Sequence, residues 1–349
     1  MKIAVIPGDG IGPEVAREGV RVLQTLSNRR GLGLDFDWFD YGADRYLRDG
    51  TTLPDKDVEM LRGYAAILFG AVGDPRVPDG RHAKDILLGL RFKLDLYINL
   101  RPCRLYADAL SPLKGKGMKE LDFVVFRENT EGLYTGLGGT FKQGTPDEVA
   151  IEEDVNTRKG VERILRAAFA YAHERGLRRV CLADKANAMQ HSGGLWRRTF
   201  KLVQGDYPGI EATAMYVDAM AMELIRRPER FQVIVTNNLF GDILTDLGAA
   251  VTGGLGLAAS ANLHPGKTSL FEPVHGSAPD IAGQGLANPL AMCLTGALML
   301  RHVGLAAEGD FLEAQVAACV REGTTTPDLG GRHPTKAVGD RMIQLVEAA

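Results

Sequence analysis

The chain has 349 residues, of which 45% are hydrophobic and 24% charged, and its formal net charge at pH 7 is −3. This length exceeds the size at which one hydrophobic core usually keeps growing, so we expect two domains. The nearly balanced charge gives no electrostatic reason to expect nucleic acid or an anionic membrane as a partner.

The N-terminal sequence and the cysteines predict a cytoplasmic protein. The apolar run in MKIAVIPGDG is too short for a signal peptide. The longest nearly apolar segment, residues 289–300, ends at Arg301 and predicts a buried helix rather than a membrane span. The four cysteines are scattered, with no CxxC pair and no metal-binding spacing, which favours a reducing compartment.

Residues 2–6 predict a strand, followed by the glycine-rich turn GDGIGPE and an amphipathic helix to about Leu26. Glycines after a strand are typical of a dinucleotide fingerprint. Here the third glycine of G-x-G-x-x-G is misplaced, and Pro13 stands where a helix begins. We therefore expect a tight turn whose backbone is approached by another chain or a cofactor, rather than a Rossmann site.

A second strand over residues 65–69 also feeds a glycine-rich turn, and residues 85–96 predict a helix. Strands that alternate with loops and helices indicate an α/β architecture. Four side chains at the spacing i, i+3, i+4, i+7 are expected to share one face of this helix: Lys84, Leu87, Leu88 and Arg91.

Arginines follow several predicted elements. Arg101 lies in NLRPC, and Arg127 follows the strand 123–126 in FRENTEGLYTG. Together with Arg91 they could bind one small polyanion, because guanidinium groups match carboxylates. A surface salt bridge is the commoner role of any single arginine, but the coincidence of three favours function. Tyr134 lies in the turn after Arg127, where a tyrosine usually serves packing.

Lys185 and Asp218 also follow predicted strands, over residues 179–183 and 212–217. A lysine at such a position can act as an acid or base if burial lowers its pKa, although a solvated lysine is more common. Residues 136–146, which lie between Arg127 and Lys185 in the sequence, are rich in glycine and threonine. They predict either a loop or an extended arm.

The segment FQVIVTNNLFGDILTDLGAA predicts a buried strand over 231–235 and then a helix that carries Asp242 and Asp246. Carboxylates four residues apart share one helix face and repel each other. A hard cation would remove this repulsion, since such ions prefer oxygen ligands. A solvated face with two acids is an equally open interpretation.

A long loop of small residues, HGSAPDIAGQG, begins at His275 and precedes ANP. Backbone N–H groups in such a loop can bind phosphates, and Asp280 could accept hydrogen bonds from ribose hydroxyls while repelling a 2′-phosphate. The pattern over residues 335–348 predicts a final helix.

Six motifs together resemble the β-decarboxylating 2-hydroxyacid dehydrogenases: GDGIGPE, LRFKLDLYINLRP, RENTEGLYTG, DKAN, VTNNLFGDILTDL and FEPVHGSAPDIAGQGLANP. That family includes 3-isopropylmalate, isocitrate, homoisocitrate and tartrate/D-malate dehydrogenases. The resemblance implies a two-domain α/β fold that is not a Rossmann fold. It also implies a discontinuous large domain, 1–98 and 252–349, around a small domain, 99–251, that carries the metal ligands and the interface of a homodimer with shared active sites.

The same resemblance implies roles for individual residues. Arg91, Arg101 and Arg127 would bind the substrate carboxylates. Mg²⁺ or Mn²⁺ would be bound by Asp242 and Asp246, with Asp218, which also contacts substrate, from the partner subunit. Tyr134 would protonate the product enol, and Lys185, also from the partner, would help to deprotonate the substrate hydroxyl. The expected NAD contacts are Ile11, Asn187, His275, Gly276, Ser277, Ala278, Asp280 and Asn288.

Leu87 and Leu88 predict the substrate within this family, because apolar side chains suit an alkyl group and would leave a carboxylate unpaired. The expected reaction is the NAD-dependent oxidative decarboxylation of 3-isopropylmalate in leucine biosynthesis. Homoisocitrate, tartrate, D-malate and other 3-alkylmalates are the alternatives. Two features keep them open: Lys84 could reach a distal carboxylate, and RENTEGLY is closer to the isocitrate and homoisocitrate members of the family. A remote alternative is a non-catalytic regulatory subunit of a heteromeric dehydrogenase.

Overall fold

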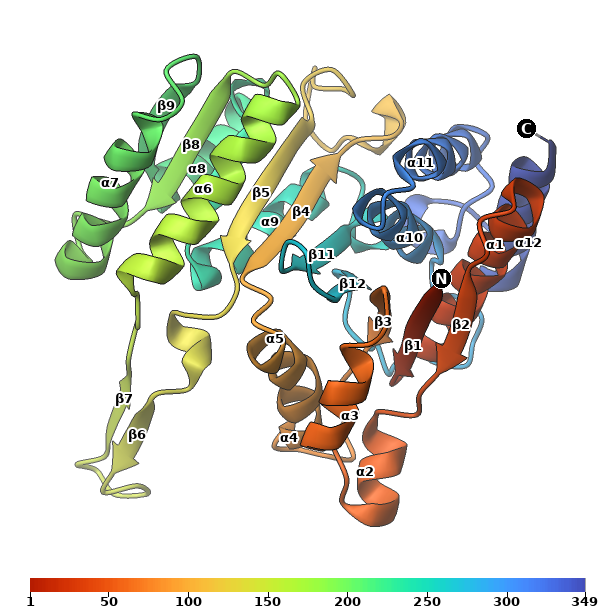
Figure 1. Ribbon diagram of the computed structural model, residues 1–349, viewed down its shortest axis with the longest axis horizontal. Helices are drawn as coiled ribbons and strands as arrows, with labels where there is room; N and C mark the ends of the chain where they lie inside the picture. Colours follow the sequence, from red (N-terminus) through yellow and green to blue (C-terminus); the bar gives the residue numbers. More distant parts are fainter. Residues whose placement is uncertain (349) are drawn as a thin grey trace. The chain divides into compact units, whose positions relative to one another are not determined.

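The chain divides into two compact units in a computed structural model that describes residues 1–348 (Figure 1). Unit 1 comprises Met1–Leu96, Arg101–Leu121 and the chain from Ala249 onward, and unit 2 comprises Tyr97–Leu100 and Asp122–Gly248. The first unit is thus assembled from separate stretches of the sequence. The predicted division into domains at 98/99 and 251/252 remains a prediction, because compactness does not show that a part folds or moves separately.

The strands of unit 1 are β1 (Lys2–Gly8), β2 (Asp35–Trp38), β3 (Ala66–Ala71), β11 (Ala259–Leu263) and β12 (Ser269–Pro273). Its helices are α1 (Gly12–Arg30), α2 (Ala43–Asp49), α3 (Asp55–Leu61), α4 (Arg81–Ala83), a π-helical turn (Lys84–Leu88), α5 (Gly89–Lys93), α10 (Leu290–His302), α11 (Ala306–Arg321) and α12 (Thr335–Ala348). Short 3₁₀ turns cover Asp108–Leu110, Leu255–Leu257 and Pro327–Leu329.

The strands of unit 2 are β5 (Asp122–Glu128), β6 (Gly138–Phe141), β7 (Val149–Glu152), β8 (Arg179–Asp184), β9 (Glu211–Tyr216) and β10 (Val233–Thr236). Its helices are α6 (Arg158–Glu174), α7 (Gln190–Gln204), α8 (Val217–Arg226) and most of α9 (Asn238–Val251), with 3₁₀ turns at Leu133–Thr135 and Pro228–Arg230. Strand β4 (Ile98–Arg104) contributes residues to both units.

In unit 1 the strand order is β2-β1-β3-β12-β11. Strand β1 runs parallel to β2 and β3, β12 runs parallel to β3, and β11 closes the series antiparallel to β12. Alternate residues of β1 face opposite sides of the sheet, and both sets, including Ile3 and Ala4, are fully buried. Helices therefore cover both faces, as expected for parallel strands.

One face of this sheet carries a hydrophobic core that includes Ala4, Ile6 and Phe69. Helix α3 and the helical segment 81–93 cover it with buried side chains such as Leu61 and Leu90. Helices α1 and α10 contact strands of the same sheet and each other, and α11 and α12 pack beside them (Figure 1). The helical segment that carries the predicted substrate residues is thus fixed directly on the sheet.

In unit 2 the strand order is β5-β10-β8-β9, and all of these pairs are parallel. Helix α6 packs on β5, β8 and β10, and α8 packs on β8 and β9. The carboxyl ends of parallel strands lie at one edge of a sheet, which is where α/β proteins usually bind ligands. Arg127, Lys185 and Asp218 each lie at or just after such an end. The α/β prediction is confirmed.

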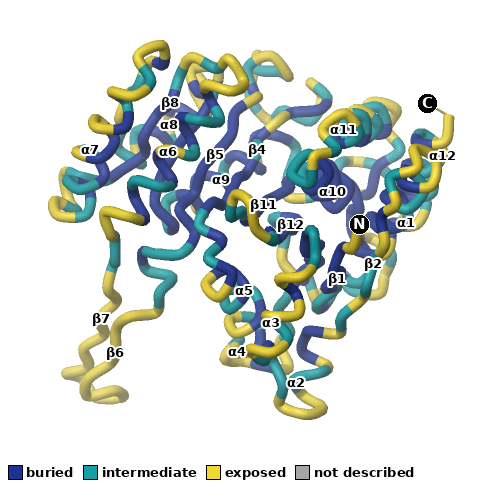
Figure 2. Tube along the Cα trace, in the orientation of Figure 1, coloured by how far each residue is buried: buried dark blue, intermediate teal, exposed yellow. Residues whose placement is uncertain are grey.

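Strands β6 and β7 form a two-stranded antiparallel arm, paired from Gly138 with Glu152 to Phe141 with Val149. Every residue of both strands is exposed, as the uniform colour of the arm in Figure 2 shows. Of the two interpretations of this region, loop or extended arm, the structure has the arm.

The glycines of GDGIGPE are approached by other segments of the same chain. A Cβ atom on Gly8 would lie 1.8 Å from the carbonyl oxygen of Ala71, and one on Gly10 would lie 1.9 Å from that of Ser277. The Ile11 N–H also donates to the Ser277 carbonyl at 2.8 Å. Close packing of backbone on backbone therefore accounts for these glycines, in agreement with the expectation that this is not a Rossmann turn.

Residues 289–300, the longest nearly apolar segment, lie almost wholly in the buried helix α10, as predicted. Across residues 1–348, no helix is both long and apolar enough to span a bilayer.

Candidate active site

Asp242 of α9 binds two of the predicted site residues within unit 2. Its Oδ1 accepts a hydrogen bond from Nη1 of Arg127 at 2.5 Å, and its Oδ2 accepts one from the Tyr134 hydroxyl at 2.9 Å. The guanidinium carbon of Arg127 lies 5.1 Å from the centre of the Tyr134 ring. A predicted metal ligand, a predicted substrate-binding arginine and a predicted acid therefore form one cluster.

Arg127 is held in place by the first turn of α9. Its Nε and Nη2 atoms donate to Oδ1 of Asn238 at 3.0 and 2.8 Å. A Cβ atom on Gly241 would lie 2.5 Å from Cγ of Arg127, so a larger residue there would displace the arginine. Sequence reasoning missed the roles of Asn238 and Gly241. The pattern NNLFGD between a strand and a helix was the available signal.

Tyr134 is suited to hold a proton. Burial raises the pKa of its hydroxyl above the usual value of 10, and the Asp242 carboxylate raises that pKa further, while the Arg127 guanidinium opposes the shift. The hydroxyl is therefore protonated throughout the neutral pH range and can donate a proton.

A second cluster in unit 2 contains Lys185 and Asp218. The Lys185 Nζ atom donates to Oδ2 of Asp218 at 2.8 Å, and this hydrogen bond lowers the pKa of the Asp218 carboxyl. The ring of Tyr216 has two cationic groups near it, with Nζ of Lys185 at 5.7 Å and Cζ of Arg197 at 4.9 Å from its centre. Asp218 is thus ionised, and it lies in the first turn of α8, two residues after the end of β9.

The donor set fits a hard divalent cation but is incomplete in one chain. Asp242 and Asp246 lie one turn apart on α9, and carboxylate oxygens are the ligands that Mg²⁺ and Mn²⁺ prefer. Among residues 1–348, no group of three or more acidic, histidine or cysteine side chains lies close enough to hold a metal ion. Asp218 is instead paired with Lys185. The metal role of the three aspartates, with Asp218 from the partner subunit, remains a prediction.

The predicted substrate helix of unit 1 differs from the expected regular helix over 85–96. It runs from Arg81 to Lys93 and contains a π-helical turn at Lys84–Leu88. The predicted common face assumed the α-helical period, which this turn interrupts. In the structure Lys84 is exposed, Leu87 and Leu88 are half-buried, and Arg91 is buried.

Arg91 forms a buried ion pair, because its Nη2 donates to Oε1 of Glu272 at 2.8 Å. Its Nε has no hydrogen-bond partner among the described residues and is inaccessible to solvent. Glu272 was not singled out from the sequence, and nothing in its local pattern marks it. Arg101 is also buried, on β4.

Most of the predicted NAD contacts lie in one loop of unit 1. Burial lowers the pKa of His275, and its buried Nε2 has no partner among the described residues, so a ligand could satisfy this atom. Asp280 is exposed, whereas Asn288 already donates to Asp328 and accepts from the Leu290 N–H. Ala278 has a positive φ of 38°. Gly276 and Ser277 lie in the same loop, whereas Asn187 is exposed in unit 2.

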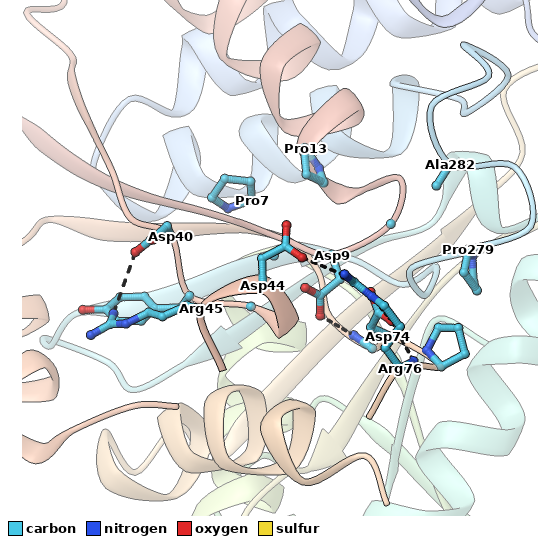
Figure 3. A pocket seen from close by; sticks show the side chains of 16 residues that line it. Pro7, Asp9, Pro13, Asp40, Asp44, Arg45, Asp74, Arg76, Pro279 and Ala282 are labelled. Atoms are coloured by element: carbon cyan, nitrogen blue, oxygen red, sulfur yellow. Dashed lines mark hydrogen bonds and ion pairs between the residues drawn. The ribbon is translucent and has the colours of Figure 1, made fainter. Parts of the chain in front are cut away.

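A cavity of about 550 Å³ borders this loop in unit 1 (Figure 3). Pro279 and Ala282 line one side, and Asp9 and the segment 40–45 line others. Its arginines are already paired: Arg76 with Asp44 and Asp74, each at 2.7 Å, and Arg45 with Asp57 at 3.5 Å. The cavity therefore suits polar uncharged groups better than a phosphate.

An α/β unit with an arginine, acids, a lysine and a protonated tyrosine near the carboxyl ends of its strands, as in unit 2, has the features of an enzyme for small carboxylic acids. Residues 2–346 match the family described as isocitrate/isopropylmalate dehydrogenase, and the chain belongs to that family. It is therefore an oxidoreductase. Enzymes of this family depend in general on NAD and a divalent metal.

Several relatives are similar over nearly their whole length. The 3-isopropylmalate dehydrogenase of Thermobifida fusca is 49% identical, with 99% of this chain and 98% of the relative covered. That of Corynebacterium urealyticum is 49% identical with both chains fully covered. The crystal structure of isocitrate dehydrogenase from Methylococcus capsulatus is 37% identical, with a TM-score of 0.90 and 99% of each chain covered. The resemblance inferred from the motifs is confirmed.

Proposed function

We propose that this protein catalyses the NAD-dependent oxidative decarboxylation of 3-isopropylmalate to 4-methyl-2-oxopentanoate and CO₂, a step of leucine biosynthesis. The observation that carries the reaction is the cluster in which Asp242 binds both Arg127 and Tyr134. Two observations support the substrate: the half-buried leucines at 87 and 88, and relatives of that activity at 49% identity.

The side chains of this chain divide the work. Arg91, Arg101 and Arg127 bind the two substrate carboxylates, since guanidinium groups pair with carboxylates in a fixed geometry. Lys185 of the partner subunit helps to deprotonate the substrate hydroxyl while hydride leaves for NAD. Asp242, Asp246 and Asp218 of the partner subunit would hold a divalent cation, which would supply positive charge beside the substrate hydroxyl and lower the pKa of that hydroxyl.

Tyr134 completes the reaction. Once the C–C bond to the departing carboxylate has broken and CO₂ has left, the enolate carbon needs a proton to become the keto acid. The Tyr134 hydroxyl holds that proton because burial raises its pKa. Arg127, stacked on the Tyr134 ring, and Asp242, bonded to its hydroxyl, orient the donor.

We propose a homodimer whose active sites are shared. Unit 2 exposes apolar side chains on three elements: Phe141 (67% exposed) and Ile151 on the arm, Met222 (59%) on α8, and Ile243 (57%) on α9. A second copy that covered these side chains would remove apolar surface from water, which favours association. The separation of the Lys185–Asp218 pair from the Asp242 cluster supports the same assembly.

The cofactor proposal is NAD rather than NADP. Asp280 is exposed on the predicted cofactor loop, where a carboxylate accepts hydrogen bonds from ribose hydroxyls and repels a 2′-phosphate. A preference of the enzyme for NADP would contradict this role. The four cysteines are all free and buried, which suits a cytoplasmic location.

Lys84 supports a second candidate substrate. It is exposed on the substrate helix and could pair with the distal carboxylate of homoisocitrate or isocitrate. The test is NADH formation with Mg²⁺ across 3-isopropylmalate, isocitrate, homoisocitrate, D-malate and tartrate. We expect the highest kcat/KM with 3-isopropylmalate. A preference for a tricarboxylate would show that Lys84, rather than the leucines, selects the substrate. A preference for D-malate or tartrate, which lack an alkyl group, would show that Leu87 and Leu88 do not select it. No turnover on any of them would favour a regulatory subunit.

A further inference from the structure

The helical segment Arg81–Lys93 carries every side chain that we assign to the substrate's alkyl group. A π-helical turn at Lys84–Leu88 interrupts it, between α4 and α5. Such turns are rare because they replace the favoured i→i+4 hydrogen bonds, and they occur mostly at functional sites. The direction in which Leu87 and Leu88 point around the helix axis, relative to Arg91, therefore depends on the contacts that fix the two ends of this segment.

The C-terminal end is held by Arg91. Its ion pair with Glu272 has a length of 2.8 Å, and the two side chains are 7% and 8% exposed. The same Oε1 of Glu272 accepts a hydrogen bond from Nδ2 of Asn262 at 2.8 Å. Because Glu272 lies on β12 and Asn262 on β11, this end of the segment is fixed to the sheet.

The N-terminal end is held by His82. Its Nε2 lies 2.9 Å from Oδ2 of Asp9, and the two side chains are 0% and 5% exposed. The ring also stacks on Tyr46 of α2, with the ring centres 6.1 Å apart. Because an ionised carboxylate only accepts hydrogen bonds, Nε2 of His82 donates to Asp9.

The second ring nitrogen of His82, Nδ1, indicates what a histidine contributes at this position. Nδ1 is buried and has no partner among the described residues. A buried polar atom without a partner destabilises the folded state, whereas an apolar side chain of similar size would fill the space without that cost. The bond to Asp9 is thus the specific contribution of a histidine at this position.

Asp9 connects this end to the loops on the cofactor side. Its Oδ1 accepts from the Ala43 N–H at 2.6 Å, and its Oδ2 accepts from the Gly73 N–H at 2.9 Å. Its own N–H donates to the Ala71 carbonyl at 2.7 Å. One carboxylate therefore joins the turn after β1, the start of α2, the loop after β3 and the substrate helix. Figure 3 shows Asp9 among the residues that line the adjoining cavity.

We propose that His82 is a positioning residue that sets the substrate selectivity of the enzyme. Through Asp9 it fixes the rotation of segment 81–93, and so the side of the helix that Leu87 and Leu88 present to the C3 substituent. Without this anchor the π-helical turn can relax to α-helix, which would rotate the preceding residues by about 100° relative to Arg91. The inference rests on the proposed function, since it concerns how that function selects its substrate.

The test compares His82→Leu with His82→Gln in the full-length enzyme. Glutamine can place an N–H donor near the position of the imidazole Nε2, so it can keep the bond to Asp9, whereas leucine cannot. The measured quantity is kcat/KM for 3-isopropylmalate divided by kcat/KM for D-malate, which lacks the alkyl group. Arg81→Ala, which alters an exposed residue of the same turn, is the control.

We expect the ratio to fall about tenfold in His82→Leu, within the range over which apolar pockets discriminate between alkyl groups, and to stay within about threefold of wild type in His82→Gln and Arg81→Ala. An unchanged ratio in His82→Leu, or equal losses on both substrates, would overturn the proposal even if the melting temperature fell. Should His82→Leu fail to fold, His82→Asn replaces it, since asparagine is too short to reach Asp9. The same fall is then expected, and an unchanged ratio would again overturn the proposal.

The outcome for wild-type enzyme separates this inference from the proposed function. If wild-type enzyme does not oxidise 3-isopropylmalate, the proposed function fails, and the ratio is taken instead between its preferred 3-substituted malate and D-malate. A ratio that is then insensitive to His82→Leu would overturn the positioning role as well.

Discussion

Tyr134 donates a hydrogen bond to Asp242 over 2.9 Å, so the proposed proton donor and the proposed metal ligand share one hydrogen bond across 108 residues of sequence. The other oxygen of Asp242 accepts from Arg127. Replacement of any one of these residues therefore alters the surroundings of the other two. The predictions below separate their roles.

Asp242→Asn should lower metal-dependent turnover by roughly 10²–10³-fold or more, because an amide is a weak ligand for a hard cation and no longer neutralises Arg127. Circular dichroism should show a folded protein. Asp206→Asn, which removes a surface carboxylate paired with Arg166, is the matched control and should keep full activity. Full activity of Asp242→Asn would remove the metal assignment.

Tyr134→Phe should lower kcat on the order of 10²–10⁴-fold, the usual contribution of a general acid. Because burial raises the pKa of Tyr134 above 10, this acid stays protonated below that pH. Wild-type kcat should therefore show no loss attributable to Tyr134 between pH 7 and 9. The measurement is kcat against pH for both proteins. A fall in the kcat of wild-type enzyme near pH 8 that is absent from Tyr134→Phe would contradict the assignment.

Shared active sites predict complementation between two inactive proteins. Asp242→Asn and Lys185→Ala should each be inactive alone, yet a mixed dimer would contain one site with neither change. After co-refolding of equal amounts, about a quarter of the wild-type activity is expected, since half of the dimers are mixed and each has one intact site. Activity no higher than that of the separate proteins would show that each chain supplies its own Lys185.

Two arginines beside Glu223 are expected to make the stability of the folded protein depend on pH. Glu223 lies on α8, the helix that carries Asp218. Hydrogen bonds from Arg227 and Arg230 lower the pKa of Glu223 from 4.5 to about 2. A lowered carboxyl pKa stabilises the folded state above the unfolded value, near 4.5, and the stabilisation is lost as the pH falls towards 2.

Urea unfolding should therefore find Glu223→Gln less stable than wild type at pH 7, with a difference that shrinks below pH 4.5. Glu174→Gln, an exposed change at the end of α6, should show no such trend. A difference that is independent of pH would assign the effect to packing instead.

Local patterns in the sequence predicted the parts of the site that depend on local structure. Lys185 was predicted to follow the strand 179–183 and Arg127 the strand 123–126. In the structure Lys185 directly follows β8, and Arg127 is the last residue but one of β5. The helix predicted over 335–348 is α12, because an amphipathic period identifies a helix that packs by one face.

Contacts between distant residues could not be predicted in this way. Arg91 pairs with Glu272, 181 positions away, and His82 pairs with Asp9, 73 positions away. Neither partner carries a local signal, because only the fold brings the two together. The π-helical turn was missed for a related reason. The common face of residues 84–91 was predicted from the α-helical period, whereas contacts with distant residues at both ends of the segment hold a π-helical turn.

The close approach of Gly8 and Gly10 to other backbone segments constrains any redesign of cofactor preference. Side chains introduced into this turn would collide with Ala71 and Ser277 before they reached a nucleotide. An engineer who transferred phosphate-binding sequences from Rossmann enzymes to GDGIGPE would therefore separate two loops and gain no new recognition. Mutations that exchange NAD for NADP are better placed around Asp280, whose side chain is exposed and free to be replaced.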